Sequence, residues 1–316
     1  MPAPFYEKMI AKHTLNRVKE SHMPFDWSIN PYRGCFHGCS FCYARATHSF
    51  LGMRADDSFQ NHIFMKENAA EALRKQLARM MSKHRGNVNA VAREIGFVAI
   101  GTATDPYQPI EGKVKLTRQC LEVLADFGIP ASITTRSPLV LRDLDLLRQM
   151  NIVSVNVSIS TLDNEICRRL EPGASYPRRR LEMVQQLTEN GIPTGIFMAP
   201  ILPCLTDSAG EIERLISQAR HHGAEFVSPS VLRLTPEVKE WFFRMIKQYY
   251  PQLLSAYLGL YRGSYPSSTY AETLMKAVHS LLDRYGFSKP APESRYMRKQ
   301  DSAEMESQGE QLSFSF

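Results

Sequence analysis

The chain has 316 residues, of which 43% are hydrophobic and 22% charged, which is ordinary for a soluble globular protein with an ample core. No apolar run approaches the roughly 18 residues that a membrane helix needs, so the sequence excludes a spanning helix of that kind. The 38 Lys and Arg residues exceed the 32 Asp and Glu residues by 6, a weak indication of phosphate-bearing partners.

The N-terminal stretch and the cysteine usage both indicate the cytoplasm. Residues 1–16 contain no continuous apolar stretch of the kind that a secretory signal requires. Six cysteines in a chain of this length do not resemble a disulfide framework, and three of them are clustered at 35–42. We therefore expect a cytoplasmic protein whose clustered cysteines bind metal.

The first part of the chain leads into this cysteine loop. Residues 1–23 are polar without a clear period, and we expect an N-terminal arm or a loose first helix there. A short extended stretch at 25–29 follows, and then Pro31 and Gly34, which suit an irregular loop that wraps a ligand.

The cysteines themselves, Cys35, Cys39 and Cys42, have the spacing C-x3-C-x2-C. Three closely spaced thiolates can hold three irons of a cubane iron–sulfur cluster, which leaves the fourth iron open to another ligand. The alternative is a zinc site, in which His37 or His48 would complete a set of three cysteines and one histidine.

Strand and helix patterns alternate after the cysteine loop. Short apolar, β-branched runs that end in polar, Gly or Pro residues predict strands, and apolar stripes at helical spacing predict helices between them. Such alternation predicts βαβ units and a parallel sheet with its chemistry at the strand ends. The predicted strands are 95–100, 131–135, 152–159, 192–199 and 224–228, and the predicted helices are 66–84, 114–127, 139–150, 178–190 and 211–222.

The last part of the chain has no strand pattern. Residues 235–286 predict helices rich in aromatic residues, and residues 287–316, rich in Pro, Ser, Glu and Gln, predict a disordered tail. We therefore expect four parts, which are an N-terminal arm at 1–23, a core at 24–234, a helical extension at 235–286 and the tail.

The sequence resembles the radical S-adenosylmethionine (SAM) superfamily, and within it the branch that is similar to spore photoproduct lyase. The resemblance extends along residues 25–235 and implies an α/β fold, a partial (β/α)6 TIM-like barrel with a helical C-terminal extension. The segments that carry it are 30–45 (NPYRGCFHGCSFCYAR), 104–109 (TDPYQP), 134–138 (TTRSP) and 159–163 (ISTLD).

The resemblance also implies the cofactors and the type of reaction. Cys35, Cys39 and Cys42 would hold a 4Fe–4S cluster, and the open iron would bind SAM. An electron from a donor such as flavodoxin or ferredoxin would cleave SAM reductively and leave a deoxyadenosyl radical. The apolar Phe41, next to Cys42, suits shielding of the cluster and contact with adenine.

The resemblance implies that SAM contacts the strand ends. Thr102, Thr104 and Asp105 would meet the amino group of SAM, although they equally suit a turn or a helix cap. The two serines of the fourth strand end, Ser158 and Ser160, would meet the ribose hydroxyls, with a capping role as the alternative.

Other strand-end residues are candidates for contacts with the cofactor or the substrate. Met198 would pack on adenine, with plain core packing as the alternative. Arg136 would meet a substrate phosphate or form a surface salt bridge. One of Arg168, Arg169 and Glu171 would meet the SAM carboxylate, with a solvated charge as the alternative.

One of the three cysteines outside the cluster is a candidate for the group that donates a hydrogen atom to the substrate radical. Spore photoproduct lyase uses a cysteine near the end of its second strand, where residues 101–105 of this chain have none. Cys204, after the fifth strand, is the candidate donor, with an inert role as the alternative. The other two, Cys120 and Cys167, are expected in the core.

Two features indicate a nucleic-acid substrate and a protein partner. Arginines at 168, 169, 178, 179 and 180 form a basic cluster that suits phosphates, with a solvated helix face as the alternative. The end of the chain, Gln311 to Phe316, resembles in part the motif by which bacterial repair and replication proteins bind the sliding clamp, with a sticky terminus as the alternative.

The expected function is that of a radical SAM enzyme, lyase-like and acting on DNA in the manner of a repair enzyme. Two alternatives stay open at this point. One is a radical SAM enzyme that acts on a protein or a small molecule, and the other is a non-enzymatic zinc-binding module. The sequence does not identify the product or the oligomeric state.

Overall fold

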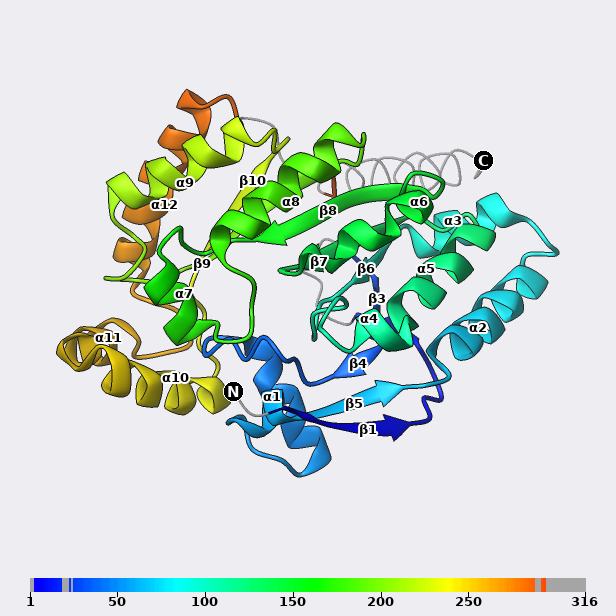
Figure 1. Cartoon of the computed structure of the whole chain (residues 1–316), viewed down its shortest axis with the longest axis horizontal. Coiled ribbons are helices and arrows are strands. Elements are labelled where there is room, and N and C mark those ends of the chain that lie inside the picture. Colours follow the sequence, from blue (N-terminus) through cyan, green and yellow to red (C-terminus); the bar gives the residue numbers. More distant parts are fainter. Residues whose placement is uncertain (1–2, 19–22, 24, 288–290, 294–316) are drawn as a thin grey trace, which may run out of the picture.

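The computed structural model describes residues 3–18, 23, 25–287 and 291–293 of the chain. Its main sheet has seven strands in the order β10-β9-β8-β7-β6-β3-β2, and β2 alone runs antiparallel to its neighbour. Six parallel strands therefore form the predicted partial barrel, which confirms the predicted fold (Figure 1). The strands of this sheet are β2 Leu15–Arg17, β3 Trp27–Ile29, β6 Val98–Ile100, β7 Ala131–Thr135, β8 Ile152–Ser158, β9 Thr194–Ile201 and β10 Val227–Val231.

Helices connect the strands and continue after the last of them (Figure 1). The α-helices are α1 Ser58–Asn61, α2 Ala69–Lys83, α3 Val88–Ile95, α4 Glu111–Val114, α5 Leu116–Asp126, α6 Leu144–Leu147, α7 Asn164–Leu170, α8 Pro177–Glu189, α9 Ala209–His221, α10 Pro236–Tyr249, α11 Leu254–Leu260 and α12 Ser268–Arg284. The residues described also contain three 3-10 helices, η1 Tyr43–Leu51, η2 Pro138–Asp143 and η3 Pro251–Leu253. Within the part of the chain described, no helix is both long and apolar enough to cross a membrane.

A second, three-stranded sheet lies beside the barrel in the order β1-β5-β4 (Figure 1). Its strands are β1 Phe5–Met9, β4 Tyr32–Arg33 and β5 His62–Lys66. The N-terminal residues that we predicted as a loose helix form β1 and β2, so that alternative is wrong. Strand β1 is stabilised by pairing in parallel with β5, a contact between segments far apart in the sequence.

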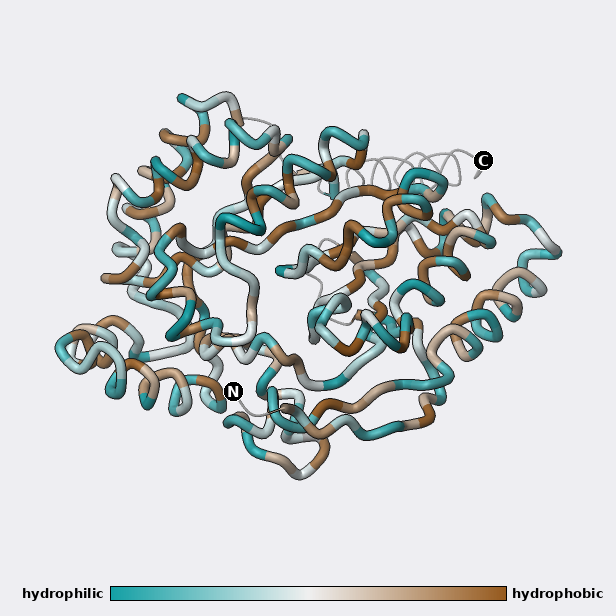
Figure 2. Tube along the Cα trace, in the orientation of Figure 1, coloured by the Kyte–Doolittle hydropathy of each residue, from teal (hydrophilic) through white to brown (hydrophobic). Residues whose placement is uncertain are grey.

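The main hydrophobic core lies between the sheet and the helices that cover it. Figure 2 shows apolar residues along the strands and polar residues on the outer sides of the helices. On β8, Val155 and Val157 belong to this core. Successive side chains of a strand point to opposite faces, so Asn156 and Ser158 face the barrel interior. The same alternation on β7 turns Ser132 inward, and the lumen is lined largely by small polar side chains.

The C-terminal helices cover the cysteine loop. Helices α10 and α11 contribute Phe242 and Tyr257 to a second hydrophobic cluster, which also contains Cys39 and Phe41. Helix α12 packs beside α9 instead. The predicted helical extension is thus helical throughout 235–286 apart from its connecting loops. Of the predicted disordered tail, only Phe287 and residues 291–293 lie within the described residues, and Phe287 and Glu293 are both buried.

Candidate active site at the mouth of the barrel

The cysteine loop follows β4 and places three thiols close together. Cys35 and Cys39 are buried and Cys42 is half-buried. Burial, together with the nearby Asp105 and Cys42, raises the pKa of the Cys35 thiol to about 12. Burial likewise raises the pKa of Cys39 well above its usual value, and both other thiols add to that rise. The three sulfur atoms therefore lie close enough together to interact electrostatically.

The turn that starts the loop requires glycine. Gly34 has a φ of +80°, and a Cβ atom there would lie 2.7 Å from the carbonyl oxygen of Phe59 and 2.9 Å from that of His62. Both obstacles are backbone atoms and cannot move aside easily. The close approach lets the Cys35 amide donate to the Phe59 carbonyl at 3.0 Å, which fixes where the loop begins.

A fully buried arginine holds the loop from within. Arg45 donates to the carbonyl oxygens of Cys39 at 2.8 Å, Gly38 at 2.6 Å and Asp56 at 2.6 Å. Its guanidinium also lies over the ring of Trp241 on α10, 5.1 Å from the ring centre. Arg45 ends the motif of the resemblance, but the sequence alone gave it no role.

Asp105 connects the cysteine loop to the ends of two neighbouring strands. Its backbone amide donates to Cys35 Sγ at 3.4 Å, and its carboxylate accepts from Thr135 Oγ1 at 2.8 Å and from the Arg136 amide at 2.7 Å. His37 Nδ1 lies 3.3 Å from the same carboxylate. Burial alone would raise the pKa of Asp105, but the histidine and these donors hold it below its usual value. Asp105 is therefore an ionised anchor beside a cysteine sulfur.

A chain of buried charges lies on the other side of the loop. Arg136 Nε is 3.5 Å from Glu171 Oε1, and Arg180 pairs with the second oxygen of Glu171. Arg180 also donates to the carbonyl oxygen of Ser158 at 2.9 Å. Burial lowers the pKa of Arg136, but Cys39 and Glu171 raise it more, so the cation stays charged near the sulfur.

The predicted SAM contacts after β6 are engaged with the loop itself. Thr104 Oγ1 donates to the Gly34 carbonyl at 2.6 Å. Thr102 Oγ1 accepts from Asn30 at 2.9 Å, and its carbonyl oxygen accepts from the Tyr43 hydroxyl. These residues are placed beside the cysteines, and contact between them or Asp105 and SAM stays a prediction.

The residues at the ends of β8 and β9 that we predicted to contact SAM do not all lie on the same face of the sheet. Ser158 is buried on the lumen face, where its carbonyl meets Arg180. Ser160 Oγ donates to Glu171 at 3.4 Å and also lines a pocket beside α9. Met198 lines that pocket too and belongs to the core between the sheet and the helices. A contact between Met198 and adenine stays a prediction.

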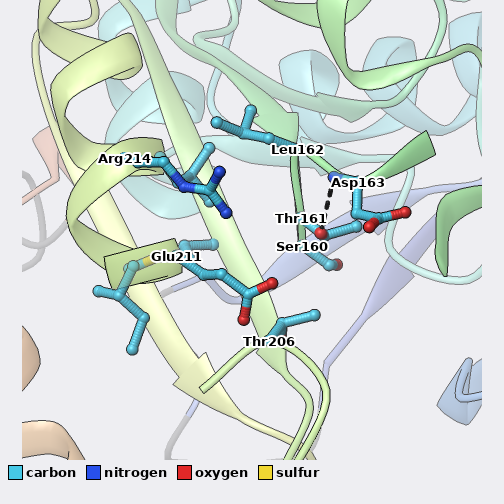
Figure 3. Close-up of a pocket in the computed structure, with 10 residues that line it drawn as sticks. Ser160, Thr161, Leu162, Asp163, Thr206, Glu211 and Arg214 are labelled. Carbon is cyan, nitrogen blue, oxygen red and sulfur yellow. Dashed lines mark hydrogen bonds between the residues drawn. The ribbon is translucent and has the colours of Figure 1, made fainter. Parts of the chain in front are cut away.

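Figure 3 shows this pocket, in which Glu211 and Arg214 extend from α9 toward the end of β8. The Asp163 amide donates to Thr161 Oγ1 at 3.0 Å along its rim. Asp163 also caps α7, because its carboxylate accepts from the Ile166 amide at 3.0 Å. The pocket is thus a polar recess outside the barrel lumen.

The remaining site residues also have defined places. Phe41 is buried with Cys39 under the C-terminal helices, where it shields the cysteine loop. Cys204 is exposed in the loop after β9, and burial and Asp207 raise its pKa. Cys120 is buried in the main core as expected, and Cys167 is buried near Arg180.

The donor set fits a 4Fe–4S cluster. Each thiolate of such a cluster binds a different iron, so the sulfur atoms do not converge on one point. Among the residues described, no group of three His, Cys, Asp or Glu side chains surrounds a single ion. The two histidines of the zinc alternative are separated, because His37 faces Asp105 and His48 lies 3.4 Å from the carbonyl of His62. An amide donor at Cys35 and a cation near Cys39 suit anionic thiolates.

A partial barrel with three clustered cysteines at its mouth fits the class of iron–sulfur enzymes. Comparison with known proteins agrees with this class. Residues 29–216 match the family model described as the radical SAM superfamily. An uncharacterized protein of Mycobacterium tuberculosis is 35% identical over 91% of this chain and 84% of its own length.

Two further relatives carry a description of function. A radical SAM Nalpha-GlyT isomerase of Pseudomonas phage M6 is 24% identical over 87% of this chain and 54% of its own length. A spore photoproduct lyase mutant with bound AdoMet and dinucleoside spore photoproduct has a TM-score of 0.63 at 18% identity, over 89% of this chain and 79% of its own.

The chain belongs to the radical SAM superfamily, and its fold is similar to that of spore photoproduct lyase. It is an enzyme whose cofactors are a 4Fe–4S cluster and SAM, and it takes a reductant and a substrate. When bound, the cluster supplies the electron that cleaves SAM to a deoxyadenosyl radical. The family membership rules out the alternative of a non-enzymatic zinc module.

Proposed function

We propose that this radical SAM enzyme acts on nucleic acid. The observation that carries the proposal is a pair of exposed arginines, Arg168 and Arg233, each lying over an exposed tyrosine ring. Arg168 is on α7, which follows β8, and Arg233 follows β10. Both arginines therefore lie after the carboxyl ends of parallel strands, on the same side of the barrel as the cysteine loop.

The positive charges of these two arginines are not neutralised by a described carboxylate, so they can attract a phosphate. Among the residues described, neither Arg168 nor Arg233 has a carboxylate within salt-bridge distance. Tyr176 and Tyr265, the rings below them, are 40% and 61% exposed, so each pair offers a cation and an aromatic face together. Cations position phosphates, and exposed aromatic rings stack on bases.

The other members of the predicted basic cluster support the proposal less. Arg180 is buried and pairs with Glu171, and Arg169 pairs with Glu165. Arg178 and Arg179 are exposed but share Glu182. Support also comes from the dinucleoside spore photoproduct that the lyase of similar fold binds.

Salt-dependent binding tests the proposal. The wild-type protein should bind a labelled single-stranded oligonucleotide more weakly as salt rises, and Arg168→Gln and Arg233→Gln should each lower the slope of log K against log salt by about 0.7. Arg178→Gln, whose cation is already paired, is the matched control and should leave the slope unchanged. Absence of binding even at low salt would overturn the proposal in favour of a protein or small-molecule substrate.

A second test follows the hydrogen atom. Deoxyadenosine recovered after incubation with deuterated DNA should carry the label if the radical abstracts a hydrogen atom from the nucleic acid. Unlabelled deoxyadenosine, formed at the same rate with and without DNA, would contradict a DNA substrate.

We also propose Cys204 as the hydrogen-atom donor that quenches the substrate radical. Its support is its exposure on the loop after β9 and its nearness to Tyr257 and Tyr261, whose pKa values are raised first by burial and also by the cysteine. Cys204→Ala should leave SAM cleavage intact and divert the substrate to side products, as measured by mass spectrometry. An unchanged product pattern would remove Cys204 from the mechanism.

We infer three finer properties beyond these. The first is that the reductant is a flavodoxin or a ferredoxin. The second is that the protein is cytoplasmic, and its six free thiols support this compartment. The segment Gln311 to Phe316, outside the described residues, binds the sliding clamp. If the full chain and a chain without that segment recover the clamp equally in a pull-down, clamp binding by this segment is contradicted.

A further inference from the structure

The recess beside α9 has two side chains of opposite charge on one wall. Glu211 and Arg214 extend into it from the first turns of α9, three residues apart and so on the same side of the helix (Figure 3). Side chains with this spacing and opposite charges commonly form an ion pair. Here no such pair forms, and among the residues described no carboxylate lies within salt-bridge distance of Arg214. Both charged groups are therefore available to a ligand.

The other hydrogen bonds of the recess define what its polar groups can still bind. Glu211 Oε2 accepts from the Ser208 hydroxyl at 2.9 Å, and Oε1 accepts from no donor among the residues described. Thr161 Oγ1, on the opposite wall, accepts from the Asp163 amide at 3.0 Å, so its own hydrogen is free to be donated. The Asp163 carboxylate is already used in capping α7. The recess therefore offers a ligand an anionic acceptor, a cation and a hydroxyl donor.

The base of the recess is apolar. Met198 of β9 and Ile212 and Leu215 of α9 line it and are buried. The volume of the recess is about 110 Å³, whereas a cavity that takes benzene measures about 150 Å³, so there is room for a few carbon atoms. A ligand that fits has charged groups for the walls and a short apolar group for the base.

The pair of opposite charges disfavours a ligand with a single charge. An anion beside Arg214 would be repelled by Glu211, and a cation beside Glu211 would be repelled by Arg214. A molecule that carries both charges close together can pair with the two side chains at once. An α-amino acid has its ammonium and carboxylate groups on one carbon atom, and its side chain can reach the apolar base.

The recess is next to the cysteine site but separate from it. Met198 belongs to the core between the sheet and the helices, so the recess lies on the helix side of the sheet. Ser160 also lines it, and its hydroxyl donates to Glu171 at 3.4 Å. Glu171 lies 3.5 Å from Arg136, the cation near Cys39. A ligand in the recess would thus be connected through Ser160 to the buried charges beside the cysteine loop.

We propose that this recess binds a free α-amino acid with a short apolar side chain. The carboxylate of the ligand pairs with Arg214 and accepts from the Thr161 hydroxyl, and its ammonium group donates to Glu211. The proposal goes beyond the nucleic-acid function and does not depend on it, because neither of the arginines assigned to phosphates lines the recess.

Calorimetric titration of L-leucine into the reconstituted, SAM-loaded protein tests the proposal, with no reductant present. Excess SAM prevents leucine from binding to the cluster through its own amino and carboxylate groups. Leucine should bind. The analogue 4-methylpentanoate lacks the amino group and 3-methylbutylamine lacks the carboxylate, so each should bind about tenfold more weakly or worse. Inorganic phosphate should not compete with leucine.

Variants of α9 locate the binding. Arg214→Gln and Glu211→Gln should each weaken leucine binding by about tenfold, because each removes one charged partner. Glu211→Gln retains an acceptor for Ser208, and Arg214 is exposed, so both variants should fold as the wild type does. Glu213→Gln and Arg220→Gln, on the same helix but outside the recess, are the matched controls and should leave the affinity unchanged.

Three results would overturn the proposal. The first is that leucine does not bind to the SAM-loaded protein. The second is that a ligand with a single charge, either analogue or phosphate, binds as well as leucine. The third is that either variant leaves leucine binding unchanged, which would place the bound leucine elsewhere. If thermal unfolding shows that Glu211→Gln does not fold, Arg214→Gln alone decides this last case. None of these results depends on whether the protein binds oligonucleotides.

Discussion

At the scale of single residues, the three cysteines share a loop but differ in their environment. Cys35 accepts a hydrogen bond from the Asp105 amide, whereas Cys39 lies near the cation of Arg136 and under the C-terminal helices. A cluster bound here would thus have a different neighbour at each sulfur, which is how proteins tune iron–sulfur potentials.

Removing one ligand should abolish the chemistry without unfolding the protein. Cys39→Ala should lose the visible absorbance of the reconstituted cluster and all deoxyadenosine production, because two thiolates cannot retain the cluster. Cys120→Ala, a buried cysteine of the main core, should keep both. Deoxyadenosine production by Cys39→Ala would contradict the assignment of this cysteine.

Glu171 makes stability depend on pH. Burial alone would raise its pKa, but Arg180 and Arg136 hold it below the usual value. A depressed pKa contributes stability that is full above the unfolded value of about 4.3 and is lost as the pH falls through the folded value.

Chemical denaturation of the apoprotein at several pH values measures this contribution. Glu171→Gln should destabilise the protein at pH 7 by about 3–5 kcal/mol, because the buried Arg180 and the half-buried Arg136 lose their partner. The stability of the variant should also fall less steeply with acid than that of the wild type. Glu182→Gln, which removes only surface ion pairs, should leave the stability nearly unchanged. Equal effects of the two variants would contradict the buried role of Glu171.

Sequence reasoning at this scale found the residues that belong to a local pattern. The cysteine spacing predicted the loop. Thr104 and Asp105, predicted as SAM contacts or as part of a turn or cap, lie beside that loop, and their contact with SAM stays a prediction. Arg45 was missed because it bonds main-chain carbonyl oxygens, which leave no trace in the residue types around it. Glu293 was missed because its partners are far from it in the sequence. Ser154 and Glu293 are 139 residues apart, a separation that no local pattern reports.

At the scale of elements, α10 and the cysteine loop stabilise each other. Phe242 of α10 is fully buried in the cluster that holds Cys39 and Phe41, and its ring meets that of Tyr257 at 5.3 Å. Truncating it opens a cavity directly beneath the cysteine loop.

Phe242→Ala should therefore destabilise the protein by about 3–5 kcal/mol and speed the loss of the reconstituted cluster in air. Leu187→Ala in α8 removes a buried side chain from the main core, remote from the loop, and should destabilise the protein by about 2–5 kcal/mol without that acceleration. Visible absorbance followed over time measures the difference. Equal rates of cluster loss would show that α10 does not support the loop.

The turn after β6 depends on a glycine. Gly101 has a φ of +91°, and a Cβ atom there would lie 2.4 Å from the Thr134 carbonyl oxygen on β7. Gly101→Ala should destabilise the protein by about 3 kcal/mol, since both the backbone and the contact are unfavourable. Gly191→Ala, with a φ of +74° and open space around it, should cost only about 1 kcal/mol. Urea titration of both variants checks this, and equal losses would refute the close approach.

Elements with a strong local signal were predicted well. Strand β7 was predicted with the bounds it has, because its buried run is closed by Gly128 and Pro130 before it and by polar residues after it. The helix predicted at 139–150 is instead η2 followed by α6, since Ser137 caps a 3-10 turn that begins at Pro138. Strands β1 and β5 were missed because their pairing joins distant segments.

At the scale of the whole molecule, segments far apart in the sequence meet at the two ends of the barrel. The cysteine loop and α10 cover the mouth, and Phe226 and Glu293 occupy the lumen face below. The sequence predicted the barrel and the helical extension, but not that the chain after α12 returns to the lumen. Composition at 287–316 indicates low apolar content, and it does not reveal a single buried carboxylate.

The hydrogen bonds of Arg45 also affect how the protein responds to loss of its cluster in air. Its bonds to three carbonyl oxygens fix the cysteine loop through the polypeptide alone, with no part taken by iron or sulfide. We therefore expect that protein stripped of its metal by oxygen regains the cluster when iron and sulfide are supplied again.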